Sequence, residues 1–321
     1  MKSFDEIYRK IYSESNQELQ KIKKANEKVD IKRFSTIIIT ILLLSLLSVI
    51  ARYVIKNSNN EILIISSIVL LPFIILLALF PMIKVYLSTS KQDYKTVFKE
   101  KVVKELVTNM DNNFEYDLNT GKDPVGLYNA YNKSGFEAYH NYDAEDYVEG
   151  ILDGKYPIRM AEVHTENEST DSEGHTHRYT VFHGIFGYIK CSKSITTTLK
   201  IRSDKGILGN LFAGKTKLEM DSPEFEKYFD INTGNKIVAM QILTHDVMEL
   251  MVEYFKEYQI MYELTIRENQ IYMRFHTGEV FEPKMNKDAL DYNMLKEYYG
   301  ILEFIFRLSR AINKAIENTE V

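Results

Sequence analysis

Two apolar runs decide the fold of this chain: FSTIIITILLLSLLSVIA at residues 34–51 and ILIISSIVLLPFIILLALFPMI at residues 62–83. Neither run contains a charged side chain, and the short segment 52–61 separates them. A helix rises about 1.5 Å per residue, so the first run can cross a hydrocarbon core of about 30 Å nearly upright and the second with some tilt. The sequence therefore predicts a two-helix transmembrane hairpin over residues 34–83, with the lipid bilayer as a partner.

The lysines and arginines around the hairpin predict its orientation. Six of them precede the first run within residues 21–33, six follow the second run within residues 84–104, and two lie in the connecting segment 52–61. Because these cations resist translocation and are attracted to the anionic inner leaflet, we expect both termini to be cytoplasmic. The segment 1–33 before the first run is too long and too acidic for the n-region of a signal peptide.

The overall composition conceals this membrane region. A mean hydropathy of −0.25, 26% charged residues and a pI near 5.9 describe an ordinary soluble protein, because the polar segment 84–321 dilutes the apolar runs. That segment is long enough for a domain with a sizeable core. The single cysteine, Cys191, has no partner for a disulfide and agrees with a reducing compartment.

The segment 1–33 predicts an N-terminal amphipathic cytoplasmic helix. Its a/d-like stripe is interrupted by Ser15 and Glu18 and is formed by Phe4, Tyr8, Ile11, Ile22, Ala25 and Val29. Such a helix can pair with another chain as a coiled coil, pack on the chain's own second cytoplasmic helix, or lie along the membrane. After the hairpin, helical spacing of apolar residues predicts a helical stalk over residues 84–110.

Residues 111–321 predict a cytoplasmic α+β domain of antiparallel strands with packed helices. The dipeptides Asp153-Gly154 and Glu268-Asn269 each predict a tight hairpin. Helix starts are predicted at Asp123-Pro124, Ser222-Pro223 and Thr244, from capping residues and prolines. The predicted strands are 147–152, 155–164, 179–190, 195–202, 260–266 and 270–276, and the last helix is 294–316.

Five strings in this domain resemble the successive motifs of one bacterial family. They are SGFEAYHNYDAEDYVEG (134–150), TVFHGIFGYIK (180–190), KLEMDSPEFEKYFDI (217–231), QILTHDVMELMVEY (241–254) and VFEP (280–283). That family is known only as a domain of unknown function attached to an N-terminal helix and a two-span membrane region. The resemblance covers residues 94–283 and implies the bacterial inner membrane as location, but it implies no reaction. The chain departs from the family in lacking a C-terminal Trp and in carrying His245 where proline is frequent.

Residues 209–216, GNLFAGKT, satisfy the phosphate-loop pattern G-x-x-x-x-G-K-[ST]. In a nucleotide site, Gly209, Gly214, Lys215 and Thr216 would cradle the phosphates at a helix N-terminus that follows directly. Here the next predicted helix begins six residues too late, and the preceding strand belongs to an antiparallel sheet. The alternative interpretation is a glycine-containing connection with an exposed lysine.

Four histidines, His164, His175, His177 and His183, flank or lie in the polar loop 165–178 together with four carboxylates. Histidines and carboxylates could bind Zn²⁺ or another divalent ion if two strands brought them together. The alternative is a solvated, mobile tip between paired strands.

The densest acidic group is Asp143, Glu145, Asp146 and Glu149. These side chains could receive a cation or a basic partner. The alternative is that Asp143 caps a turn while the others are solvated at the start of a strand.

Two functions remain open from the sequence. The first is a membrane-tethered cytoplasmic interaction or scaffold module with a protein partner and no catalytic residues, compatible with a homo-oligomer. The second is a nucleotide- or metal-dependent enzyme that uses the loop at Gly209–Thr216 or the pair His175 and His177. We expect no cofactor and no nucleic-acid partner.

Overall fold

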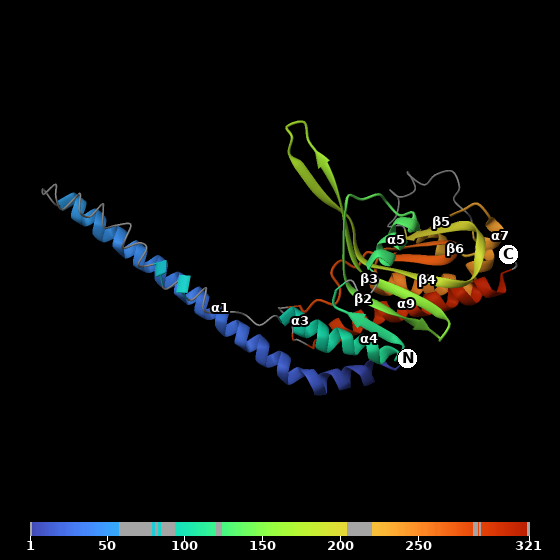
Figure 1. Ribbon diagram of the computed structural model, residues 1–321, viewed down its shortest axis with the longest axis horizontal. Helices are drawn as coiled ribbons and strands as arrows, with labels where there is room; N and C mark the ends of the chain where they lie inside the picture. Colours follow the sequence, from blue (N-terminus) through green and yellow to red (C-terminus); the bar gives the residue numbers. More distant parts are fainter. Residues whose placement is uncertain are drawn as a thin grey trace. The chain divides into compact units, whose positions relative to one another are not determined.

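The computed structural model describes residues 2–57, 79–80, 83–84, 94–119, 124–203, 220–284, 288 and 290–319. The chain divides into two compact units, of which the first combines Met1–Glu14 with Phe98–Val321 and the second is Ser15–Val97. The first unit contains an antiparallel sheet and its covering helices (Figure 1). The α+β class predicted for the C-terminal part is therefore confirmed.

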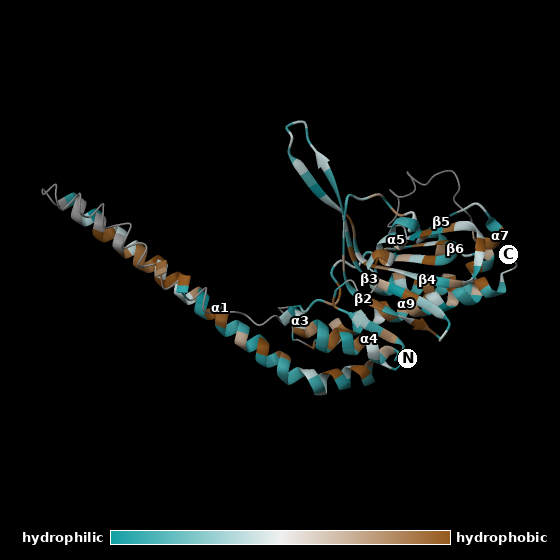
Figure 2. Ribbon diagram, in the orientation of Figure 1, coloured by the Kyte–Doolittle hydropathy of each residue, from teal (hydrophilic) through white to brown (hydrophobic). Residues whose placement is uncertain are grey.

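Helix α1 (Phe4–Asn57) continues without a break through the N-terminal stretch and the first apolar run. Among the described residues it is the one helix long and apolar enough to cross a membrane (Figure 2). Of its most apolar 18-residue window, 6% is buried. By length and composition, such a helix near the N-terminus is compatible with a membrane span or a signal sequence. The second apolar run lies outside the described residues apart from residues 79, 80 and 83, so the structure describes one of the two predicted spans.

The sheet has six strands, all paired antiparallel, in the order β1-β2-β3-β4-β5 with β6 also on β4. The strands are β1 (Phe114–Asp117), β2 (Asn141–Leu152), β3 (Tyr156–Thr170), β4 (Thr176–Ser203), β5 (Phe229–Thr233) and β6 (Tyr262–Phe275). Asp153 and Gly154, both with positive φ, form the predicted tight turn between β2 and β3.

Strand β6 is folded back on itself as a hairpin. Glu268 has a φ of +53° at the predicted turn, and the N–H of His276 donates to the carbonyl oxygen of Met261 at 2.8 Å. Residues at the two ends of β6 therefore lie opposite each other. The hairpin predicted across Glu268-Asn269 is confirmed.

Strand β4 bends around the tip of this hairpin. The first arm of β4, residues 185–190, pairs with residues 270–275 of β6. The second arm, residues 199–202, pairs with residues 263–266 of β6. Between the two arms, Ile195 lies opposite Glu268 at the tip of the hairpin. Figure 1 shows β4 curving around β6 in this way. The two strands predicted at 179–190 and 195–202 are thus the two arms of one bent strand.

The β3–β4 hairpin extends beyond the rest of the sheet as a two-stranded ribbon (Figure 1). Pairing between β2 and β3 begins at Glu166, whereas pairing between β3 and β4 continues to Thr170 and Thr176. Residues 165–178 were expected to form a polar loop. Cross-strand pairing instead orders most of this segment, and only residues 171–175 form the turn.

Eight further helices or helical turns belong to the described part of the chain. They are α3 (Tyr94–Phe98), η1 (Lys99–Val103), α4 (Lys104–Met110), α5 (Pro124–Ser134), α6 (Pro223–Glu226), α7 (Lys236–Ile242), α8 (His245–Tyr258) and α9 (Tyr292–Asn318). Ser222 and Thr244 cap α6 and α8 through their side-chain oxygens, as predicted. The predicted cap Asp123 lies outside the described residues.

Helices cover the two faces of the sheet. On one face, Tyr131 of α5 packs against Phe182 and Phe186 of β4 in a buried apolar cluster. On the other face, the Ser309 hydroxyl of α9 contacts the Met273 sulfur of β6 at 3.8 Å. The sheet is therefore buried on both sides, with α9 spanning the second face.

The first turns of α1 pack within their own chain. Phe4 contacts the ring of Tyr292 of α9 edge to face, and the Tyr8 hydroxyl donates to the carbonyl oxygen of Leu290 at 3.0 Å. The Lys10 ammonium lies 2.8 Å from the Glu105 carboxylate of α4. Of the three interpretations of the N-terminal helix, packing within the chain holds for these turns.

The expected stalk is partly a buried element of the first unit. Phe98, Val102, Leu106 and Met110 form a stripe of buried side chains along α3, η1 and α4. The compact unit therefore begins at Phe98, before the boundary expected at residue 111.

Candidate functional site

A lysine with no exposed surface lies at the point where the chain enters the first unit. Lys99 is the first residue of η1, a π-helical turn between α3 and α4. Single π-helical turns are rare in proteins, but many of those that occur lie at functional sites. A buried ammonium is costly unless it is paired, so its surroundings define the candidate site.

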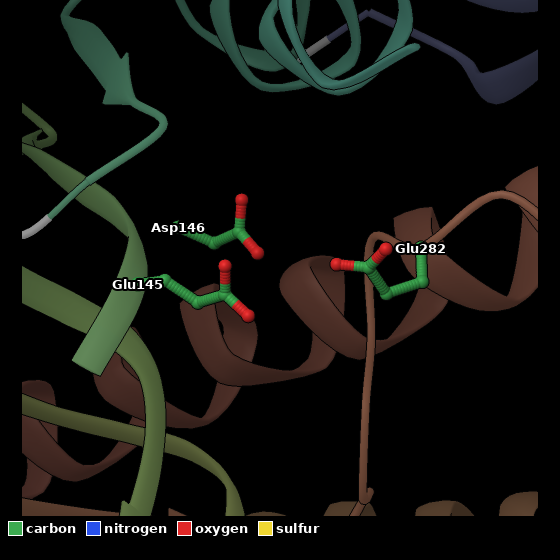
Figure 3. Close-up of side chains that lie close together, drawn as sticks. All are labelled: Glu145, Asp146 and Glu282. Carbon is green, nitrogen blue, oxygen red and sulfur yellow. The ribbon is translucent and has the colours of Figure 1, made fainter. Parts of the chain in front are cut away.

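Three carboxylates surround the Lys99 ammonium. Its Nζ lies 2.5 Å from Asp146, 2.7 Å from Glu282 and 3.1 Å from Glu145. Figure 3 shows these carboxyl groups facing one another, two from β2 and one from the segment that precedes α9. Their oxygens lie within 4.8 Å of one another, which is a spacing that could hold a metal ion. In this chain the lysine ammonium takes that position.

The backbone at this cluster is strained in two places. Asp146 has a φ of +57° at a β-bulge in β2, and Phe281, next to Glu282, also has a φ of +57°. For an aromatic residue this left-handed conformation is a true outlier. Such strain persists only where the surrounding structure holds it, and it is concentrated at functional sites.

Burial and pairing shift the pKa values of the cluster. Burial alone would lower the pKa of Lys99, but hydrogen bonds to Asp146 and Glu282 outweigh it, so the pKa is raised and the lysine stays charged. Burial raises the pKa of Asp146 to about 6, although hydrogen bonds from Lys99 and Tyr116 oppose this. Burial and the Asp146 charge raise the pKa of Tyr116, so its hydroxyl remains a donor to Asp146.

A second layer of the cluster contains Glu162 and His183. Glu162 is buried, accepts a hydrogen bond from the N–H of Val280 at 2.9 Å and lies 3.2 Å from His183 Nε2. Burial, together with the charges of Asp146 and Glu145, raises the pKa of Glu162 to about 8. Burial and the neighbouring His164 lower the pKa of His183. This layer therefore favours a protonated acid beside a neutral imidazole at neutral pH.

The cluster is a network of ion pairs around a buried ammonium. We call Lys99 with Asp146, Glu145 and Glu282 the ionic latch. Lys99 is held in its charged form, so it does not offer a free amine for covalent or base catalysis. Three segments distant in sequence meet at its ammonium: η1, the bulge of β2 and the stretch at Glu282. Breaking the contact would leave the buried Asp146 carboxylate without a cation, so the latch holds these segments together.

The structure divides the four candidate histidines into two pairs. His164 and His183 lie opposite each other on β3 and β4 and stack at 4.6 Å between ring centroids. His175 and His177 lie at the ribbon turn, six or more residues further along the ribbon, which is about 20 Å. The four side chains therefore do not form one set.

The other sequence candidates have different outcomes. The phosphate-loop pattern at Gly209, Gly214, Lys215 and Thr216 lies outside the described residues. In the acidic group, Glu145 and Asp146 do receive a cation, but it is Lys99 of the same chain. The alternative of solvated side chains is wrong for Asp146, which has no exposed surface.

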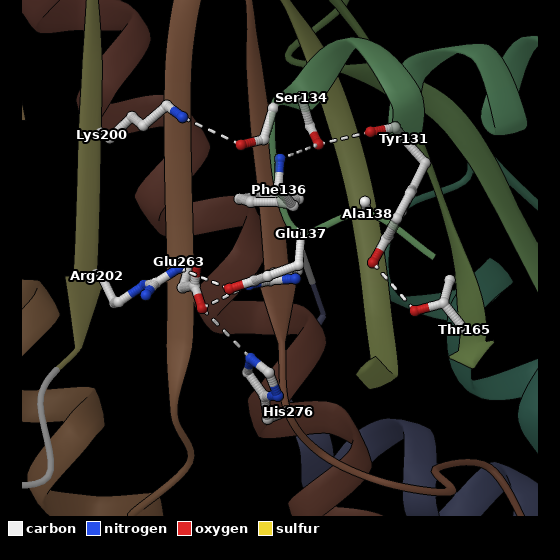
Figure 4. Close-up of polar contacts among 12 residues, drawn as sticks. Tyr131, Ser134, Phe136, Glu137, Ala138, Thr165, Lys200, Arg202, Glu263 and His276 are labelled. Atoms are coloured by element: carbon white, nitrogen blue, oxygen red, sulfur yellow. Dashed lines mark hydrogen bonds and ion pairs between the residues drawn. The ribbon is translucent and has the colours of Figure 1, made fainter. Parts of the chain in front are cut away.

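A second charged network ties the α5–β2 connection to the sheet. Arg274 of β6 is buried, donates to Glu137 and Glu263, and lies with its guanidinium 4.3 Å from the ring centre of Phe136. Figure 4 shows Arg202 and His276 joining the same carboxylates. Burial would raise the pKa of Glu263, but these partners lower it to about 2. Each carboxylate of the network has a cationic partner, whereas Nε and Nη1 of Arg274 are buried without a hydrogen-bond partner among the described residues. We assign the network a structural role.

A shallow aromatic pocket lies between α5 and the start of β2. It has a volume of about 290 Å³ and is lined by Pro124, Val125, Tyr128, Tyr142, Asp143 and Ala144. The Tyr128 and Tyr142 rings stand nearly perpendicular at 5.3 Å between centroids. Val125 is 66% exposed and Tyr128 is 43% exposed, so two walls of the pocket face solvent.

Comparisons with known proteins identify a domain but no activity. No curated protein matches this chain. One similar solved structure is the crystal structure of the mycobacterial trehalose monomycolate transport factor A, TtfA, with a TM-score of 0.33 and 8% identity over 65% of this chain and 92% of that chain. At that TM-score the likeness supports no conclusion on fold or function. A family model described as "Protein of unknown function (DUF3137)" matches residues 180–314, so this part of the chain is supported as a domain of unknown function, as the sequence resemblance implied.

Proposed function

We propose that this protein is a membrane-tethered interaction module, held in the bacterial inner membrane by a hairpin of residues 34–51 and 62–83. Both termini lie in the cytoplasm, and the α+β domain binds a protein partner close to the bilayer. The observation that carries the proposal is the apolar window of α1, of which 6% is buried. Because hydrocarbon surface of this extent is unfavourable in water, a bilayer is its natural solvent.

The folded unit supports the proposal because it has a core of its own. Helices α5 and α9 of the same unit cover the two faces of its sheet. The run is therefore free to serve as a tether. The cations at residues 21–33 and 84–104 support the same orientation for both ends of the hairpin.

The Lys99 cluster supports a stably folded first turn of the domain, where the chain arrives from the proposed tether. The second unit ends at Val97, and Lys99 is the second residue of the segment Phe98–Val321 of the first unit. The latch fastens this first turn to β2 and to the stretch at Glu282. We infer that the latch keeps the first turn of the domain folded where the tether joins it.

The aromatic pocket supports the partner-binding half of the proposal. Tyrosines are enriched in protein interfaces, where they combine a large apolar ring with a hydroxyl group. We assign the pocket to an apolar side chain of a protein segment. A photocrosslinking residue at Val125 should capture this partner, whereas the same residue at Glu257, an exposed position of α8, should not.

The enzyme alternative has weaker support. Its phosphate-loop candidate lies outside the described residues, and of its four candidate histidines His175 and His177 meet at an exposed turn, apart from His164 and His183. No specific observation in the described part of the chain favours it over the module.

Membrane extraction tests the tether. Leu43→Arg with Leu46→Arg places two charges near the middle of the apolar run, where each costs about 2.5–3.5 kcal/mol of insertion free energy. Ile31→Arg is the matched control, because Ile31 is exposed on the same helix before the run. We expect alkaline carbonate to leave the natural chain and the control in the membrane pellet and to release part of the double variant. Release of the natural chain would refute the tether.

A further inference from the structure

The turn of the β3–β4 ribbon brings two histidines to one carboxylate. Asp171 Oδ2 lies 3.1 Å from His177 Nε2 and 3.5 Å from His175 Nδ1. His175 ends the turn and His177 is the second residue of β4, and both side chains approach the same carboxylate oxygen. Glu173 adds a second carboxylate, 3.9 Å from His175 Nδ1.

The turn fixes the carboxylate that the histidines share. Asp171 Oδ1 accepts hydrogen bonds from the N–H groups of Glu173 at 3.0 Å and His175 at 2.9 Å. The Asp171 N–H in turn donates to the carbonyl oxygen of His175 at 3.0 Å. One oxygen thus accepts the hydrogen bonds of the turn, and the other, Oδ2, faces the histidines.

Two of the three ligand separations at this turn are close to the edges of a tetrahedral zinc site. Zinc binds histidine nitrogen and carboxylate oxygen at about 2.0–2.2 Å, so two ligands of a tetrahedron lie about 3.3–3.5 Å apart. The two measured edges, 3.1 and 3.5 Å, are close to that value. The third edge, between the histidines, requires His175 to rotate. His175 is 70% exposed and His177 is 66% exposed, so neither is held by packing.

The site lies at the end of the two-stranded ribbon, where a bound ion would stabilise the pairing of the two strands. An isolated two-stranded ribbon is marginally stable in water. Beyond Glu166 neither β2 nor β6 pairs with this ribbon through the backbone, and Asn167 and Glu168 form its last described hydrogen bonds to residues 138–141. An ion that bridges Asp171 and His177, on opposite arms of the hairpin, would close its open end.

We propose that the ribbon turn is a binding site for a divalent transition-metal ion of the zinc class, with Asp171, His175 and His177 as ligands. Glu173 or water completes the coordination. Since three protein ligands leave one position open, the site suits an ion shared with another molecule rather than a closed structural site. The proposal does not depend on the membrane tether.

Zinc titration of the full chain in detergent, purified without a histidine tag, tests the site. Calorimetry with ZnCl₂ should show one site, and His175→Ala and His177→Ala should each weaken binding by about tenfold or more. His164→Ala is the matched control, since His164 belongs to the other histidine pair and should leave zinc binding unchanged. Cobalt in place of zinc should give the visible absorption of tetrahedral coordination, which is lost in the two turn variants.

Hydrogen exchange separates a built site from casual binding by surface histidines. Zinc should slow exchange of the ribbon amides at residues 167–170 and 176–179 and leave the amides of β6 unchanged. The proposal is overturned if zinc binds equally well to the His175→Ala and His177→Ala variants, if His164→Ala abolishes binding, or if the ribbon amides exchange at the same rate with and without zinc.

Discussion

Replacing Lys99 by methionine should destabilise the folded unit far more than the same change at an exposed lysine. Methionine keeps most of the length of the side chain and removes the ammonium. Asp146, Glu145 and Glu282 then lose the cation that lies 2.5–3.1 Å from each of them. The expected loss comes from the buried Asp146 charge that is left without its cation.

The expected magnitude follows from burial. Removing one partner of a buried ion pair costs about 3–5 kcal/mol, which is a large part of the roughly 5–15 kcal/mol that typical domains possess. Lys10→Met is the matched control, since Lys10 pairs with Glu105 at 2.8 Å while both side chains remain about one-third exposed or more. Exposed pairs of this kind contribute about 1 kcal/mol or less.

Urea unfolding of the full chain in detergent, followed by far-ultraviolet circular dichroism, measures the difference. Native-state hydrogen exchange of the β2 amides serves as a local readout if the two compact units unfold separately. The cost of Lys99→Met should be smaller at pH 5 than at pH 8, since acid neutralises the orphaned carboxylates. A cost no greater than that of Lys10→Met would refute the latch.

Three further outcomes are expected. The pKa of Glu162 rises from 4.5 in the unfolded state to about 8 in the native state, so the native state keeps a proton that the unfolded state releases. The free energy of unfolding should therefore fall by about 4–5 kcal/mol between pH 4.5 and 8. In urea titrations, the free energy of unfolding of Glu162→Gln should depend less on pH over this range. Asp146→Ala should cost about 1 kcal/mol more than Asp146→Asn in the same assay, because asparagine tolerates positive φ; equal costs would contradict the strain at this position. Gly184→Ala should cost more than about 3 kcal/mol, because its Cβ would lie 2.0 Å from the Phe275 carbonyl oxygen, whereas Gly154→Ala, with open space, should cost about 1 kcal/mol.

Local signals in the sequence predicted most of the fold. The turns at Asp153-Gly154 and Glu268-Asn269, and the caps Ser222 and Thr244, depend on neighbouring residues and are found where expected. Strands β1 and β5 and helix α7 were not predicted. These elements are only four to seven residues long, and β1 and β5 exist through pairing with strands far away in sequence. Short runs carry too little periodicity to be recognised without their partners.

The candidate site was missed because its centre resembles a surface residue. Lys99 stands in a series of lysines after the second apolar run, where its charge predicts a position near the lipid phosphates. Its buried ammonium cannot meet them. One signal was available: Lys99 occupies the apolar stripe of its helix, four residues before Val103 and seven before Leu106. Its partners lie in two of the strings that carry the family resemblance, but sequence alone does not bring them together.

The placement of two single cysteines on either side of the hairpin tests the membrane account most directly. In a Cys191→Ala background, Ser3→Cys and Ser172→Cys place exposed thiols before the hairpin and on the ribbon turn. The account predicts that a membrane-impermeant maleimide labels neither site in intact cells and both sites in inverted vesicles. Labelling of the two sites from opposite sides would contradict the hairpin, and labelling of both sites from outside would contradict the cytoplasmic domain.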